Sequence, residues 1–232
     1  PVVTDMEAAL QPGAPVLFEE HGSNLIFETG IGLEDKPLEG ADTVAEVRMV
    51  SQRLAGVPME PNGCVAVPEG DNMTVYIPSQ NPIAVRDVIV AQCDLDPAKL
   101  RVLAPTVGGG FGPKAGAYVE HFITTRLARE LNRPCKWTEQ RSEDMVSLVH
   151  GRAMVLSAKL GVKSDGTIVG LDCEVVADSG AYPAIGGFLT FLTQTMIQGV
   201  YQIPKIRFHA VTAATNTTST GAYRGAGRPE AT

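Results

Sequence analysis

The chain has 232 residues, of which 44% are hydrophobic, and its formal net charge is −7. This is the composition of a globular protein with one sizeable core or two small ones. An acidic chain without a cluster of Lys and Arg lacks the basic face that binds phosphate backbones, so no nucleic-acid partner is expected. No apolar run reaches the roughly 18 residues of a membrane-spanning helix.

The cysteines and the chain ends carry two further expectations. The four cysteines are Cys64, Cys93, Cys135 and Cys173, and no two of them form a CxxC pair. Iron–sulfur and zinc motifs need such close pairs, so we predict reduced thiols in a cytoplasmic protein. The chain starts without Met or a signal-peptide pattern and stops just after a glycine-rich segment, so we expect an internal piece of a larger protein.

The first half of the chain yields several predicted elements. Residues 1–40 are rich in Pro, Gly and Glu and show weak periodicity, which predicts an irregular N-terminal segment. Alternating apolar and polar residues predict a strand at 43–49. A hairpin is predicted with strands at 64–67 and 73–78, joined by turn residues at 69–72.

The next elements frame a run of glycines. Asn81 followed by Pro82 predicts the start of a helix, with Asn as the N-cap. A short apolar strand is predicted at 100–105, then the glycine run at 108–112, then a helix over 115–131.

The last third continues the alternation of strands and helices. Strands are predicted at 135–139, 153–162, 167–177 and 206–213, and a helix at 189–200. Strand pairs interspersed with helices predict an α+β fold with mixed sheets.

The glycine run is the first candidate for chemistry, because glycines let a ligand approach the main chain and a helix N-terminus attracts anions. A nucleotide-binding module is one alternative. It is weakened because Pro113 stands where the last Gly of GxGxxG belongs, and because Ala115 replaces the Ser or Thr of GxxxxGK[ST]. A tight strand-to-helix turn is the other alternative.

Two polar residues are further candidates. Gln80, at the end of a predicted strand, can donate an amide hydrogen bond to a bound oxo group, although such a residue also caps turns. Arg224, within the glycine-rich segment 221–228, suits an anionic ligand or a developing oxyanion, although it can equally be solvated.

Four segments together carry a resemblance. They are PMEP at 58–61, SQN at 79–81, GGGFG at 108–112 and AYRGAGR at 222–228. In this order they resemble the xanthine dehydrogenase and aldehyde oxidase superfamily of molybdenum hydroxylases, and the last is similar to the active-site loop of form II aerobic carbon monoxide dehydrogenase large subunits. The resemblance implies that 41–232 is a molybdopterin-binding domain of a large subunit, truncated at its C-terminal end.

The resemblance also implies roles for individual residues. Gln80 would hydrogen-bond a molybdenum oxygen ligand, the loop around Phe111 would lie beside the metal and its dithiolene, and Arg224 would be catalytic, binding substrate or stabilising charge. No side chain would bind the metal directly. The implied cofactor-binding residues are Gln80, Gly109, Gly110, Phe111, Gly112, Gly225 and Ala226.

Cofactors and partners follow from the same resemblance. The implied cofactor is a molybdenum–pterin, in its cytosine dinucleotide form, and the substrate is a small molecule oxidised with water-derived oxygen. FAD and a 2Fe–2S centre would reside on a medium FAD subunit and a small iron–sulfur subunit, which agrees with the absence of cysteine pairs here. The family's glutamate base would lie beyond residue 232, so neither Glu60 nor Glu120 is assigned that role.

Two departures bear on the substrate. Carbon monoxide oxidisers have a Cys after the loop arginine to anchor copper, where this chain has Gly225, and copper(I) needs such a soft ligand. Purine oxidisers have a Glu after the loop lysine, where this chain has Ala115. Oxidation of carbon monoxide, hydroxylation of an aldehyde or N-heterocycle, and an inactive assembly partner stay open.

Overall fold

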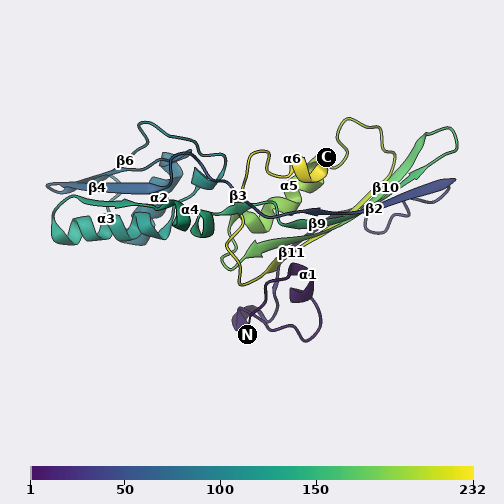
Figure 1. Cartoon of the computed structure of the whole chain (residues 1–232), viewed down its shortest axis with the longest axis horizontal. Helices are drawn as coiled ribbons and strands as arrows, with labels where there is room; N and C mark the ends of the chain where they lie inside the picture. Colours follow the sequence, from purple (N-terminus) through teal and green to yellow (C-terminus); the bar gives the residue numbers. More distant parts are fainter. Residues whose placement is uncertain (1) are drawn as a thin grey trace. The chain divides into compact units, whose positions relative to one another are not determined.

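A computed structural model describes residues 2–232 and divides them into two compact units (Figure 1). Unit 1 comprises the described residues up to Leu54 together with Val149–Thr232, and unit 2 comprises Ala55–Leu148. The short strand β3 (Leu54–Ala55) contains one junction, and β8 (His150–Gly151) follows the other. Both units mix sheets with helices, so the predicted α+β class is confirmed.

Unit 1 is built on a five-stranded sheet in the order β1-β11-β10-β9-β2. Its strands are β1 (Leu25–Ile31), β2 (Thr43–Ser51), β9 (Met154–Val162), β10 (Ile168–Gly180) and β11 (Ile206–Ala214). The pair β10–β11 is parallel and all other pairs are antiparallel. The predicted hairpin is formed by β9 and β10, and its turn contains Gly166 with a φ of 88°.

The core of unit 1 lies on one face of this sheet. Helix α5 (Leu189–Met196), preceded by the 3-10 turn η3 (Ile185–Phe188), packs there against β11. The helix predicted to end at residue 200 therefore ends earlier, at Met196. The buried core side chains are Met154, Leu156, Cys173, Val175, Ala177, Leu189, Phe208 and Ala210.

The first forty residues contain β1, the helix α1 (Met6–Ala9) and the 3-10 turn η1 (Glu19–His21). The irregular stretch between α1 and β1 is organised by Asn24, which is 3% exposed. Its Nδ2 donates to the carbonyls of Ala9 and Pro15, and its Oδ1 accepts from the N–H of Leu17. A single buried amide thus satisfies main-chain groups that no ladder pairs.

Unit 2 is a four-stranded sheet in the order β6-β5-β4-β7, with helices along one face (Figure 1). Its strands are β4 (Gly63–Glu69), β5 (Asn72–Tyr76), β6 (Leu100–Leu103) and β7 (Cys135–Thr138). Helix α2 (Pro82–Cys93) connects the parallel strands β5 and β6, and α3 (Val119–Leu131) precedes β7. The core between sheet and helices includes Ala66, Val75, Val85, Ile89 and Ala128.

The start of α3 differs from the sequence prediction. Residues Pro113–Ala115 form a separate 3-10 turn (η2), and α3 begins only at Val119. The glycine run is therefore not at the N-terminus of α3, so the prediction that it forms an anion site at the start of this helix is wrong. The predicted ends of the neighbouring helices hold: the Oδ1 of Asn81 caps α2, and Asn132 ends α3 in the left-handed conformation.

Two short helices complete the secondary structure, α4 (Arg141–Ser147) in unit 2 and α6 (Arg228–Ala231) in unit 1. Among the described residues, no helix combines the length and apolarity needed to cross a bilayer.

Candidate functional site

Gln80 and the glycine loop meet in unit 2. Gln80 stands between β5 and α2, and its side-chain Oε1 accepts a hydrogen bond of 2.8 Å from the N–H of Gly112. Its own N–H donates to the carbonyl of Lys114 at 2.9 Å. Because Oε1 is held by the loop, the Nε2 amide is the donor that Gln80 offers to a ligand.

The loop glycines are required by close approach and by backbone conformation. A Cβ on Gly110 would lie 2.4 Å from Oε1 of Gln80, and Gly109 and Gly112 have φ values of 100° and 110°. Phe111 between them has a φ of 56° and is 41% exposed. A left-handed non-glycine residue is uncommon and costs free energy, which is typical of loops shaped for a ligand.

A buried lysine also holds the loop. Lys114 is 1% exposed, and its Nζ donates to the carbonyl of Glu60 at 2.7 Å and to Oε2 of Glu60 at 3.0 Å. The same Oε2 accepts from the N–H of Gly108 at 2.7 Å. A P-loop lysine must reach a phosphate, whereas the ammonium of Lys114 is enclosed and engaged, which argues against the nucleotide-binding alternative.

The segment before β4, which contains Glu60, is anchored by a buried polar cluster. Oε2 of Glu139 accepts from the N–H of Asn62 at 2.7 Å, and Arg141 donates to the carbonyl of Pro58 at 2.5 Å. Burial raises the pKa of Glu139. Glu139 and the neighbouring Asp144 are both buried, at 5% and 1% exposure.

His121 completes this cluster as a neutral side chain. Its Nδ1 accepts from the N–H of Tyr118 at 3.2 Å, so its proton is on Nε2, which donates to Oδ1 of Asn62 at 3.2 Å. Burial lowers the pKa of His121 to about 4. The glycine loop is thus supported by a chain of contacts that runs from His121 and Glu139 through the segment of Glu60.

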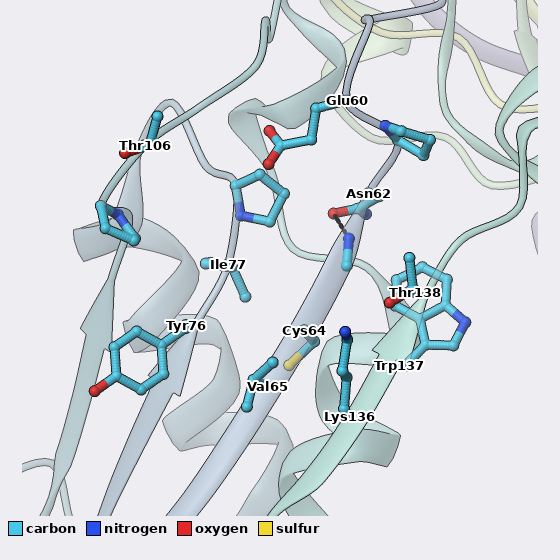
Figure 2. Close-up of a pocket in the computed structure, with 14 residues that line it drawn as sticks. Glu60, Asn62, Cys64, Val65, Tyr76, Ile77, Thr106, Lys136, Trp137 and Thr138 are labelled. Atoms are coloured by element: carbon cyan, nitrogen blue, oxygen red, sulfur yellow. Dashed lines mark hydrogen bonds between the residues drawn. The ribbon is translucent and has the colours of Figure 1, made fainter.

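A pocket of about 260 Å³ lies beside Glu60 (Figure 2). Its described lining combines apolar side chains with Glu60, Tyr76, Thr106 and Lys136. It shares Glu60 with the glycine-loop network, but none of the sequence-predicted site residues is in the described lining.

The arginine loop belongs to unit 1. Arg224 is exposed, and the three residues after it, Gly225, Ala226 and Gly227, have φ values of 115°, 42° and 98°. A Cβ on Gly227 would lie 2.7 Å from Leu192 of α5, so this glycine allows the loop to pack on the helix.

The predicted site residues therefore form two groups. Gln80, Gly109, Gly110, Phe111 and Gly112 are brought together in unit 2, while Arg224, Gly225 and Ala226 share the loop of unit 1. The sequence motifs assign no role to Lys114 or to Arg152, which donates to the carbonyl of Tyr223 in the arginine loop, because the partners of both are distant in sequence. The only signal for Lys114 was its place at the end of the glycine motif.

The unit 2 loop fits a large cofactor that brings its own metal ligands. The exposed Gln80 amide is a donor suited to an anionic or oxo acceptor, and such a contact requires no protein side chain on the metal.

The molybdopterin cofactor-binding domain family matches residues 17–232. The chain is 34% identical to the carbon monoxide dehydrogenase large chain of Hydrogenophaga pseudoflava, over 97% of this chain and 30% of that protein. It is also 34% identical to the gamma subunit of the 6-hydroxypseudooxynicotine dehydrogenase complex of Paenarthrobacter nicotinovorans, over 100% of this chain and 30% of that protein.

The fold is likewise similar to a solved structure. Quinoline 2-oxidoreductase from Pseudomonas putida 86 superposes with a TM-score of 0.92 and 29% identity, over 98% of this chain and 30% of that one. The chain thus spans about 30% of the length of the relatives it matches. It belongs to the family of molybdopterin cofactor-binding domains found in the large subunits of molybdenum hydroxylases.

Proposed function

We propose that this chain is the part of a molybdenum hydroxylase large subunit that holds the molybdenum–pterin through Gln80 and the glycine loop and presents Arg224 to the substrate. The observation that carries the proposal is the contact of Gln80 Oε1 with Gly112 N–H, in a loop where Gly110 has no room for a Cβ. This contact fixes the orientation of the exposed Gln80 amide beside the glycine loop.

Each residue then has a limited task. When bound, the molybdenum–pterin supplies the two-electron oxidation that adds a water-derived oxygen to the substrate. The Nε2 amide of Gln80 would orient an oxygen ligand, and the loop formed by Gly109, Gly110, Phe111 and Gly112 would lie beside the cofactor. Gly225 and Ala226, in the loop of unit 1, are also proposed to bind the cofactor.

Arg224 binds the substrate and stabilises negative charge that develops on it, because a guanidinium offers several donors and keeps its positive charge. Glu60 is not proposed as the general base, because its Oε2 already accepts from Lys114 and Gly108. We expect the base in the remainder of the full-length protein.

We infer that the substrate is an aldehyde or an N-heterocycle, although the AYRGAGR loop resembles form II carbon monoxide dehydrogenases. Gly225, next to Arg224, has no thiolate to offer copper. Its φ of 115° is strained for any other residue, and a Cβ there would lie 2.7 Å from Cδ of Pro229. Quinoline 2-oxidoreductase, whose name specifies an N-heterocycle, supports this choice.

The same proposal includes the rest of the complex. We infer the cytosine dinucleotide form of the pterin, a medium FAD subunit and a small 2Fe–2S subunit that remove the electrons, and a cytoplasmic location. The 6-hydroxypseudooxynicotine dehydrogenase relative is named as the gamma subunit of a complex, which supports partner subunits here.

The test uses the full-length protein purified with its co-expressed partner subunits. Molybdenum and pterin dinucleotide content are measured, and aldehydes, N-heterocycles and carbon monoxide are screened as substrates. We expect a molybdenum-containing complex that hydroxylates an aldehyde or N-heterocycle, and a loss of roughly a hundredfold or more in kcat/KM with Arg224→Ala.

Arg133→Ala, at an exposed position after α3, is the matched control and should be fully active. Full activity of Arg224→Ala would remove that residue from the mechanism. A folded complex without molybdenum would favour the assembly-partner alternative, and a melting temperature raised by ATP or NAD would favour the nucleotide-binding one.

A further inference from the structure

A second arginine, Arg152, contacts the main chain of the Arg224 loop. Its Nη1 donates to the carbonyl of Tyr223 at 2.8 Å and its Nη2 donates to the carbonyl of Arg224 at 2.9 Å. The guanidinium carbon also lies 5.1 Å from the centroid of the Tyr223 ring, within the range of a cation–π contact. One planar group therefore holds two consecutive peptide units and the neighbouring ring.

Glu230 connects Arg152 to the far end of the same loop. One carboxylate oxygen lies 3.1 Å from Nη1 of Arg152, and the other accepts from the N–H of Gly227 at 2.9 Å. The side chains of Arg152 and Glu230 are 11% and 1% exposed. In such a buried arrangement both charges need their partners. Arg152 therefore holds the carbonyls of Tyr223 and Arg224, and Glu230 holds the N–H of Gly227.

The backbone that presents Arg152 is strained. Arg152 and Ala153 have φ values of 65° and 63°, and two consecutive non-glycine residues in the left-handed region are uncommon. Just before them, a Cβ on Gly151 would lie 2.2 Å from Cβ of Tyr223, so the segment approaches the loop as closely as glycine allows. Such strain persists only where surrounding contacts fix it, here at the loop that carries Arg224.

We propose that Arg152 is a positioning residue for Arg224, an inference that rests on the proposed role of Arg224. By fixing the carbonyls on both sides of the Arg224 N–Cα bond, the guanidinium of Arg152 sets the main chain from which the Arg224 side chain extends. Small displacements of a substrate-binding group reduce rate strongly, so the effect of Arg152 passes through Arg224.

The fork geometry distinguishes arginine from lysine here. A lysine retains the charge opposite Glu230 but offers a point ammonium, which cannot hold two carbonyls in one plane. Arg152→Lys in the full-length holoenzyme is therefore the main test variant. Arg207→Lys is the matched control, because Arg207 likewise forms ion pairs, here with Asp172 and Glu174 of the neighbouring strand β10 in the sheet of unit 1.

Three measurements are made on these variants: molybdenum content, amide hydrogen exchange of the peptide covering 221–228, and kcat and KM. For Arg152→Lys we expect unchanged molybdenum, roughly tenfold faster exchange in the loop and roughly tenfold lower kcat/KM. Arg207→Lys should change neither exchange nor kinetics. Glu230→Gln, which keeps the size of the side chain, should also speed loop exchange and lower kcat/KM, each by a smaller factor. This variant replaces Arg152→Lys as the test if Arg152→Lys does not fold.

The decisive arm combines Arg152→Lys with Arg224→Ala. If Arg152 acts through Arg224, the double variant should lose no more kcat/KM than Arg224→Ala alone, whereas a purely structural role gives multiplicative losses. Multiplicative losses, or unchanged loop exchange in Arg152→Lys, would overturn the proposal. Failure of the proposed function is recognised separately, because a wild-type complex without molybdenum or activity still reports loop exchange.

Discussion

Lys114 and Glu60, 54 positions apart in the chain, form an ion pair of 3.0 Å in which the lysine is 1% exposed and the glutamate side chain 39%. The lysine ends the glycine loop and the glutamate belongs to the segment that enters β4. The pair therefore ties the loop to the segment that enters the sheet of unit 2.

Lys114→Met should destabilise unit 2 and loosen the glycine loop. The change removes two hydrogen bonds of the ammonium, while water can replace the lysine at the partly exposed Glu60 and so limits the cost. We therefore expect the free energy of unfolding to fall by about 1–3 kcal/mol. Thermal unfolding of the full-length protein measures it. Lys99→Met, at an exposed pair with Asp71, should cost no more than about 0.5 kcal/mol, and equal effects of the two variants would contradict the anchoring role.

Gly110→Ala should displace the amide of Gln80. The new methyl group would lie 2.4 Å from Oε1 and 2.5 Å from Cγ of Gln80, so either the loop or the Gln80 side chain must move. We expect reduced molybdenum retention and a loss of roughly a hundredfold in kcat/KM, as for a misplacement of about 1 Å. Gly116→Ala is the control, because no atom lies within 4 Å of its Cβ position, and wild-type behaviour of both variants would show that the contact is dispensable.

Two substitutions at Gln80 separate its two hydrogen-bonding functions. Gln80→Glu keeps an acceptor for the N–H of Gly112 but loses the amide donor, whereas Gln80→Leu loses both. We expect Gln80→Glu to retain loop order by hydrogen exchange while kcat falls roughly a hundredfold. Gln80→Leu should in addition exchange faster in the loop. A fully active Gln80→Glu variant would contradict the donor role.

The stability of unit 1 should depend on the charge of His209. Its Nε2 lies 2.8 Å from Oε1 of Glu28 and its Nδ1 lies 2.8 Å from Oε2 of Glu174, and hydrogen bonds to these carboxylates, Glu28 foremost, raise its pKa. This stabilising contribution is complete below the unfolded pKa of about 6.5 and is lost as pH rises through the raised pKa of the folded protein.

His209→Gln should accordingly weaken the pH dependence of the melting temperature between about pH 5.5 and about pH 8.5. The melting temperature should fall more at the acidic end of this range than at the basic end. His21→Gln, at an exposed histidine, should leave the pH dependence unchanged. A His209→Gln variant with the pH profile of the wild type would show that the two glutamates stabilise the sheet without the imidazolium.

The sequence predicted most strands because their apolar alternation and turn chemistry are local. The hairpins around Gly70 and Gly166, the N-cap Asn81 and the C-cap Asn132 needed only neighbours to be recognised. Strand β1 was missed because its burial does not alternate, and the start of α3 was misplaced because Pro113–Ala115 forms its own 3-10 turn.

For the candidate site, the sequence alone identified the residues whose side-chain chemistry suggests ligand binding: Gln80, the glycines at 108–112 and Arg224. Only the tertiary structure decided how they are held, through Lys114 on Glu60 and Arg152 on the carbonyls of the Arg224 loop. Contacts between residues 54 or 71 positions apart leave no periodic trace, because chain folding and not local conformational preference brings them together.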